Sequence, residues 1–199
     1  MNEKIKLNKS ELTKLKKEEK NYLQFLPVLK LKQEQLQIES IKIKKNIKEK
    51  KQNFIKENEK IEKFVSLFND INLNINLKEK IKIFNTEIIE KSVAGIKLPY
   101  IKKITFKEEE ICFFELPTFI IQNIENIKKL LIINKELDIL NKQSFLLNKE
   151  LKKTIQRINL FEKILIPKNK EYIKKIKIVL SDEQVAAVGR GKIAKKKNK

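Results

Sequence analysis

Few of the 199 residues belong to the types that usually carry catalysis or hold metals. The chain has no histidine and one cysteine, Cys112, so it offers neither a Cys–His pair nor a zinc-ligand cluster. Cys112 lies in the apolar run ICFFEL, where a packed thiol is expected. A phosphate loop of the form GxxxxGK(S/T) is also absent. The sequence therefore predicts no catalytic residue, no metal site and no cofactor.

The net charge of +20 raises the question of nucleic-acid binding. Arg157 and Arg190 are the two arginines, and every other basic residue is lysine. Lysine lacks the bidentate fork with which arginine reads bases and phosphates, so a general lysine bias explains the charge better. The phenylalanines are not interleaved with the basic runs, as a stacking platform would require. The charge leaves an acidic protein partner or channel open.

The overall composition is typical of long amphipathic helices. Hydrophobic residues make up 41% of the chain, with 3 glycines and 4 prolines, which is little glycine for a compact α/β enzyme. No apolar run is long enough to cross a membrane, and the N-terminus lacks the apolar core of a signal peptide. We therefore expect a cytoplasmic protein without a transmembrane segment.

The N-terminal part, residues 1–68, is predicted to be one long helix with a heptad seam. Asn8 or Ser10 is suited to the N-cap, and Pro27 is expected to bend the helix. The seam positions recur at spacings of three, four and seven: Leu12, Leu15, Tyr22, Leu26, Leu29, Leu36, Ile43, Ile47, Phe54 and Ile61.

An insert at residues 69–115 changes the pattern from helical to extended. Ile71–Leu77 alternates strictly between apolar and polar residues, which is a β-strand period. The following β-branched residues predict strands at Ile81–Val93 and Leu98–Phe106, joined as a hairpin at Ala94–Gly95. Because an isolated hairpin is marginally stable, we expect it to lie against the helices.

A second long helix is predicted over residues 116–183, followed by a basic tail at 184–199. Thr118 is a candidate N-cap, and Pro167 lies inside the helical pattern. The predicted seam consists of Leu130, Ile133, Leu137, Leu140, Leu147, Leu151, Ile158, Phe161, Leu165, Tyr172 and Val179.

Two seamed helices that flank a short insert predict a mostly α fold, a long antiparallel two-helix coiled coil with a short β-hairpin insert, as one elongated unit. The heptad pattern allows the two helices to pair in registers that differ by seven residues, so a further criterion must select one. We select the register that places Pro27 level with Pro167. In that register Leu36 faces Ile158, Ser40 faces Thr154 and Ile47 faces Leu147.

Four segments of the chain resemble the D subunit of V-type and A-type ATPases, in its bacterial form. They are Leu12–Lys14 with Leu26–Leu36, Ser92–Phe106, Thr154–Leu180 and Val185–Lys197. The third is the most specific, with its arginine–x–asparagine core and the LIP kink. One departure is a general replacement of arginine by lysine, for example at Lys168, which weakens any bidentate contact inferred there.

The resemblance implies a central rotor-stalk subunit, an axle that transmits torque between ATP hydrolysis or synthesis and proton or sodium transport. Both termini would enter the bore of the hexamer of catalytic A and B subunits. The F subunit would dock on the coiled coil, and the C subunit would join the axle to the membrane ring. The complex would lie on the cytoplasmic, inner face of the membrane, and its catalytic sites would belong to other chains. The alternatives are a generic basic coiled-coil scaffold and a nucleic-acid-binding protein.

The family motifs suggest which residues contact partner subunits. The candidates are Arg157, Asn159, Pro167, Gly189, Arg190, Gly191 and Lys192. The basic ends, Lys4–Lys20 and Arg190–Lys199, would suit a polar or electronegative sleeve, because lysines on flexible stems form diffuse and easily exchanged contacts.

Overall fold

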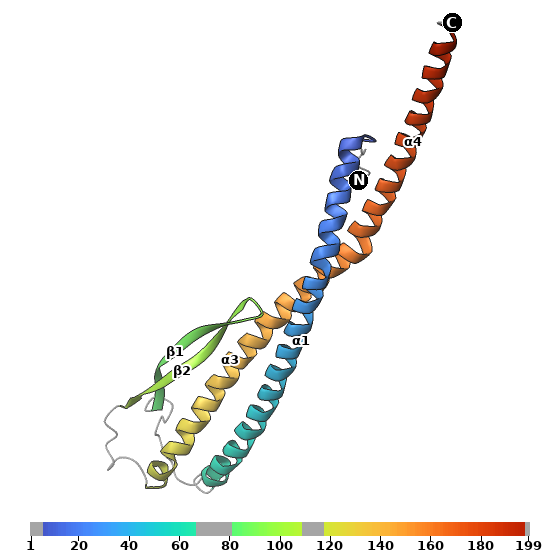
Figure 1. Cartoon of the computed structure of the whole chain (residues 1–199). Helices are drawn as coiled ribbons and strands as arrows, with labels where there is room; N and C mark the ends of the chain where they lie inside the picture. Colours follow the sequence, from blue (N-terminus) through green and yellow to red (C-terminus); the bar gives the residue numbers. More distant parts are fainter. Residues whose placement is uncertain (1–5, 67–80, 109–117, 198–199) are drawn as a thin grey trace. The chain divides into compact units, whose positions relative to one another are not determined.

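The computed structural model describes residues 6–66, 81–108 and 118–197. Its elements are α1 (Lys9–Ser66), strands β1 (Ile81–Val93) and β2 (Ile96–Glu108), α3 (Thr118–Leu160), the π-helical turn η1 (Phe161–Leu165) and α4 (Ile166–Lys197) (Figure 1). The chain divides into two units, one formed by residues 1–34 and 152–199 and the other by residues 35–151. We call them the terminal unit and the hairpin unit. The predicted fold class, mostly α with a small antiparallel hairpin, is confirmed.

The start of α1 is fixed by a side-chain cap. The Glu11 backbone N–H donates to Asn8 Oδ1 at 2.8 Å, which satisfies one of the free donors of the first turn. Asn8, rather than Ser10, is therefore the N-cap. The Ile71–Leu77 alternation, Cys112 and Pro117 lie outside the described residues, and α3 begins at Thr118.

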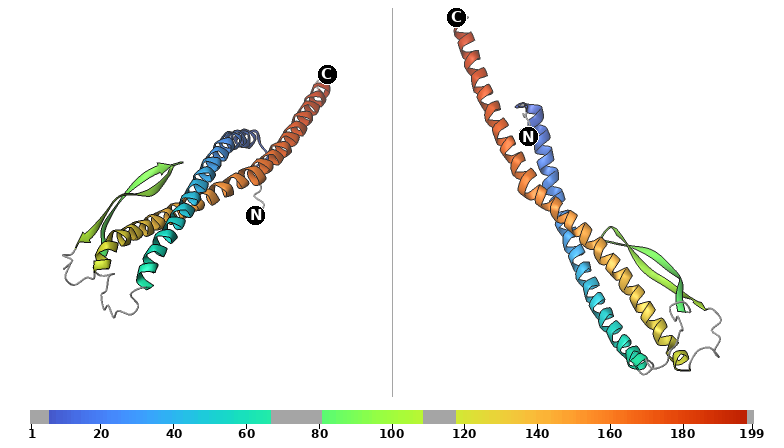
Figure 2. Two further views of the ribbon diagram at one scale, coloured as in Figure 1. Left: turned by 90° about the horizontal axis from the view of Figure 1, so that it is seen from below. Right: turned by 180° about the vertical axis from the view of Figure 1, so that it is seen from behind.

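In the hairpin unit, β1 and β2 pair in an antiparallel ribbon beside α3 (Figures 1 and 2). The predicted β1 bounds are confirmed, and β2 extends two residues further at each end than expected. Ala94 and Gly95 form the turn with φ angles of 49° and 77°, the left-handed pair that a tight hairpin needs. A methyl group in this region is strained. Ala94 nevertheless packs against the core of the unit, which offsets part of that cost.

The core of the hairpin unit joins α1, α3 and the hairpin. Leu36, Leu98 and Leu147 are fully buried, and Ile43 is nearly so. Half-buried apolar side chains surround these four: Ile47, Val93, Ala94, Ile96, Tyr100, Leu140, Leu146 and Leu151. Leu98 is the hairpin's contribution, so the same cluster that joins the two helices also holds the ribbon.

The predicted helix register is wrong in the hairpin unit. The Ser40 hydroxyl donates to Asn148 Oδ1 at 3.2 Å, although Thr154 is the partner that the sequence predicts. Lys50 Nζ lies 2.5 Å from Glu136 Oε2, and Leu147 packs with Leu36 and Ile43. The helices are thus displaced by about one heptad from the prediction, a shift that leaves apolar positions facing apolar positions. Proline matching is the wrong criterion for choosing between registers that differ by a heptad.

The buried residues along α3 and α4 reveal a change of helix phase at η1. Upstream of η1, the predicted seam residues Leu137, Leu147 and Ile158 are buried. Downstream, burial moves to Ile166, Ile173 and Ile176, and Leu180 packs beside them in place of Val179. A π-helical turn holds one residue more than an α-helical turn. The centre of the buried face therefore moves by one position after η1, from Leu165 and Tyr172 to Ile166 and Ile173, while Tyr172 still packs beside the core.

The second helix also continues further than expected. The sequence predicts a basic tail at residues 184–199, yet α4 is helical as far as Lys197. Gly189 and Gly191 lie within it, with no atom within 4 Å of the place that a Cβ would occupy. Each glycine costs a helix about 1 kcal/mol, and the neighbouring alanines and lysines are among the better helix formers. The glycines therefore weaken this end of the helix without terminating it.

Burial predicts different effects for two neighbouring residues of α3. Leu147→Ala should lower the free energy of unfolding by about 2–5 kcal/mol, because it leaves a cavity in the core of the hairpin unit. Phe145 is 68% exposed, and Phe145→Ala should change stability by at most about 0.5 kcal/mol. Urea denaturation followed by circular dichroism measures both. Equal losses would contradict the assigned core.

Candidate partner-binding surfaces

Arg157 and Asn159 lie near the end of α3 on either side of the buried Ile158. Both side chains are exposed, and their backbone is regular helix. They are accessible to a partner, while Ile158 holds this turn in the core.

Pro167 is the second residue of α4, separated from η1 by Ile166. A proline ring inside an α-helix would clash with the carbonyl four residues earlier, here that of Lys163, and could not donate to it. The chain instead makes a wider turn, in which the Ile166 N–H donates to the Phe161 carbonyl oxygen. The kink expected at Pro167 is thus accommodated by a π-helical turn, a frequent device at functional positions in helices.

Pro27 of α1 lies level with the start of this turn. The rings of Tyr22 and Phe161 have centroids 5.1 Å apart, and Lys30 Nζ lies 3.1 Å from Glu162 Oε1. Pro27 lies between Tyr22 and Lys30 in the chain, so Pro27 and the π-helical turn lie at neighbouring levels of the terminal unit, although α1 continues through Pro27 as one helix. The ion pair is half exposed and contributes little stability, so the aromatic contact is the stronger link.

Asn169 is a seam residue that the sequence pattern missed. The side chain is buried, and its Nδ2 has no hydrogen-bond partner among the described residues. An uninterrupted heptad places Asn169 outside the seam. The sequence signal for this buried residue is a polar side chain shortly after leucine–isoleucine–proline. A proline inside a helix can be accompanied by a π-helical turn, whose extra residue moves the buried face.

Gly189, Arg190, Gly191 and Lys192 are all exposed on α4. Arg190 borders a groove against the start of α1, which contributes Lys9 and Leu12. Lys177, Leu180 and Ala187 line the groove from α4. The four candidate contact residues at the C-terminal end therefore lie beside or beyond the first turn of α1.

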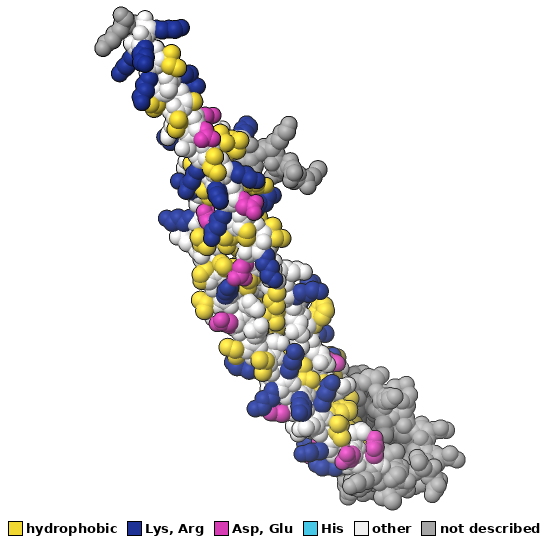
Figure 3. Space-filling view, turned by 90° about the vertical axis from the view of Figure 1, so that its right-hand side faces the viewer, with side chains coloured by type: hydrophobic (Ala, Val, Ile, Leu, Met, Phe, Trp, Pro, Cys, Tyr) yellow, Lys and Arg dark blue, Asp and Glu magenta, His cyan; other side chains and the backbone are white. Residues whose placement is uncertain are grey.

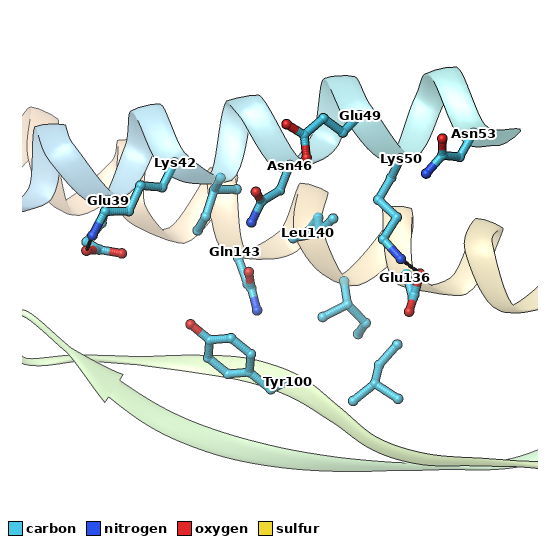
Figure 4. A pocket seen from close by; sticks show the side chains of 13 residues that line it. Glu39, Lys42, Asn46, Glu49, Lys50, Asn53, Tyr100, Glu136, Leu140 and Gln143 are labelled. Carbon is cyan, nitrogen blue, oxygen red and sulfur yellow. Dashed lines mark hydrogen bonds and ion pairs between the residues drawn. The ribbon is translucent and has the colours of Figure 1, made fainter. Parts of the chain in front are cut away.

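A second groove, in the hairpin unit, is not predicted by the sequence pattern. It has a volume of about 430 Å³ and lies between α1 and β2 over α3 (Figure 4). Its lining residues are Glu39, Lys42, Ile43, Asn46, Glu49, Lys50, Asn53, Tyr100, Ile101, Glu136, Ile139, Leu140 and Gln143. The Gln143 amide donates to the Pro99 carbonyl oxygen and so ties the hairpin wall to α3. We call this the hairpin groove.

The signal for the hairpin groove is present in α3. Ile139, Gln143 and Leu146 recur at spacings of four and three, as a second stripe beside the seam. A helix with two such stripes contacts two neighbours. Assigning only one apolar stripe to each helix overlooks the face of α3 that contacts the hairpin.

Comparison with known proteins identifies the family. The model of the family described as the D subunit of ATP synthase matches residues 11–196. The V-type ATP synthase D subunit of Borreliella burgdorferi is 40% identical over 194 residues, covering 96% of this chain and 94% of the relative. The chain belongs to the ATP synthase D-subunit family. Another D subunit, from Chlamydia muridarum, is 33% identical over 201 residues, covering 99% and 97% of the two chains.

Membership of the D-subunit family agrees with the resemblance seen in the sequence, over nearly the whole chain. Within the described ranges, no helix has the length and apolar character needed to span a bilayer. Those ranges also hold no group of three or more potential metal ligands. On the face shown in Figure 3, lysine and arginine side chains are scattered among hydrophobic ones and form no continuous stripe.

The account of η1 predicts the effect of removing the proline. Pro167→Ala restores an N–H donor and removes the ring clash, so it should raise the free energy of unfolding by about 1–3 kcal/mol. Amide hydrogen exchange should slow in Phe161–Leu165. A matched control is Lys170→Ala, which alters a nearby exposed residue and should leave both quantities nearly unchanged. Faster exchange in Pro167→Ala would contradict the proposed cause of the turn.

Proposed function

We propose that the chain is the central rotor-stalk subunit of a V/A-type rotary ATPase. It transmits torque between ATP hydrolysis or synthesis in the catalytic hexamer and proton or sodium transport in the membrane ring. Family membership supports its place in the complex. One structural observation carries the axle role, namely a helical C-terminal segment that continues past the first turn of its partner helix.

The C-terminal end of α4 has the properties of a segment that is covered by other subunits. Val185, Val188 and Ile193 are 70%, 60% and 62% exposed, although they are apolar. α1 begins at Lys9, which shares a groove with α4 residues between Lys177 and Arg190, and α4 continues alone beyond this groove in the terminal unit (Figure 1). Exposed apolar residues on a lone helix indicate an interaction surface. The proposed partner is the bore formed by the A and B subunits.

The basic residues of this segment suit a rotating contact. Arg190, Lys192 and Lys195–Lys197 are exposed, and no ion pair is recorded for them within the described ranges. Long flexible cations form weak, exchangeable contacts with a polar wall, so no single rotor angle is strongly preferred. The small Ala186, Ala187, Gly189 and Gly191 keep the helix narrow.

The other proposed partners follow from the organisation of the complex. The F subunit docks on the coiled coil, and the C subunit connects the end that carries the hairpin to the membrane ring. ATP sites belong to partner chains, because this sequence has neither a phosphate loop nor a histidine. The chain is peripheral, on the cytoplasmic side of the membrane, as part of the complex. In energetic terms, a rotor is a ligand that binds three catalytic-site states unequally.

Two truncations of the chain test the axle role. Ending the chain after Gln184 removes the exposed apolar residues, and the complex should still assemble with the F subunit while coupling of ATP turnover to ion transport is severely reduced. Ending the chain after Ala194 keeps those residues and should retain most of the coupling. ATP hydrolysis and ion uptake are measured together in reconstituted vesicles. Full coupling in the chain that ends at Gln184 would contradict the proposal.

A further inference from the structure

We propose that the hairpin groove binds a basic, amphipathic helix of a partner subunit. That a partner subunit exists rests on the proposed function. The chemistry of that partner is inferred from the groove itself. The groove lies wholly within the hairpin unit, residues 35–151.

The α1 wall of the groove has the repeat of a helix-binding surface. Its residues recur at spacings of three and four: Glu39, Lys42, Asn46, Glu49 and Asn53. They form a line about 20 Å long at a rise of ~1.5 Å per residue. This stripe is separate from the seam that contains Leu36, Ile43 and Ile47, so α1 retains a second face for another chain.

The floor of the groove has the same period. Glu136, Ile139, Leu140 and Gln143 line the groove from α3 at spacings of three and four. Side chains from α1 and α3 therefore recur about every 5.4 Å, one helical turn. An extended strand repeats every ~6.8 Å on one face and would fall out of step over this length. A helix lying along the groove keeps step with both of these helices.

The base of the groove accepts an apolar stripe. Ile43 and Ile139 are buried there, and Leu140 and Ile101 remain half exposed. Tyr100 extends from the hairpin over this base (Figure 4). A helix with small or aliphatic residues on one side would remove this apolar surface from water.

The charges in the groove indicate the sign of the charge that the partner carries. Three carboxylates, those of Glu39, Glu49 and Glu136, line it with two ammonium groups, those of Lys42 and Lys50. Lys42 pairs with Glu39 at 2.7 Å and Lys50 with Glu136 at 2.5 Å. Glu49 lies 3.9 Å from Lys45, and both side chains are mostly exposed, so its charge is weakly compensated.

The groove is thus slightly acidic on a chain of net charge +20. A basic helix is repelled by most of this surface and attracted here, which gives the site its specificity. Asn46 and Asn53 add side-chain amides that can bond to polar residues flanking the apolar stripe of the partner.

A pair of double variants with opposite charge tests the proposal. The chain is co-expressed with the A, B, C and F subunits, and the subunits retained on the tagged chain are quantified across a salt titration. Asn46→Lys with Asn53→Lys should weaken retention of the partner that carries the helix by at least tenfold. Asn46→Asp with Asn53→Asp should preserve or strengthen it. Both pairs change residues of the groove wall that lie outside the buried core, and circular dichroism checks that both variants fold.

A photo-crosslinking benzophenone side chain in place of Asn46 identifies the contact, with Lys48, on another face of α1, as the control position. We expect adducts from position 46 at residues spaced three or four apart in one basic segment, and none of these from position 48. Equal weakening by the Lys and Asp pairs, or no adduct in an assembled complex, would overturn the groove assignment. Failure of the unmodified chain to enter the complex would instead overturn the proposed function.

Discussion

Burial of one apolar stripe between two long helices is the constraint on which the rest of the structure depends. An isolated helix is only marginally stable in water, and in a protein its stability comes mainly from the face that it buries. In the hairpin unit this face consists of Leu36, Ile43 and Leu147, and in the terminal unit of Leu15, Ile173 and Ile176. Every irregularity in the helices must leave the stripe facing its partner.

Pro167 shows how this constraint operates. Its ring disrupts the α-helical ladder, and the chain responds with the π-helical turn Phe161–Leu165. The extra residue rotates the following stripe by one position, so Ile166 and Ile173 are buried where an uninterrupted heptad would bury Leu165 and Tyr172. The stripe survives because isoleucine stands at the displaced positions. The rotation also brings Asn169 into the core, where its Nδ2, which has no hydrogen-bond partner among the described residues, costs stability.

The hairpin is attached through the same cluster. Leu98 is fully buried against the helix pair, and the Gln143 amide bonds to the Pro99 carbonyl oxygen. A free two-stranded ribbon would be marginal, and this attachment makes it one wall of a groove. The terminal unit offers a different kind of surface, the exposed apolar and basic residues of α4. A protein that contacts several partners can thus present distinct chemistry in its two units.

The sequence by itself determined the two long helices and the two strands, both β1 bounds, the N-cap region and the residues of the stripe before the π-helical turn, because these follow from local periodicity and turn chemistry. The resemblance in four segments also led to the correct family. Tertiary structure decided the register, because a shift of one heptad places apolar residues opposite apolar residues again, and only contacts such as Ser40 to Asn148 distinguish the alternatives. It also decided the phase beyond the π-helical turn and the groove beside Tyr100, because both depend on how separate segments pack rather than on the pattern within one segment.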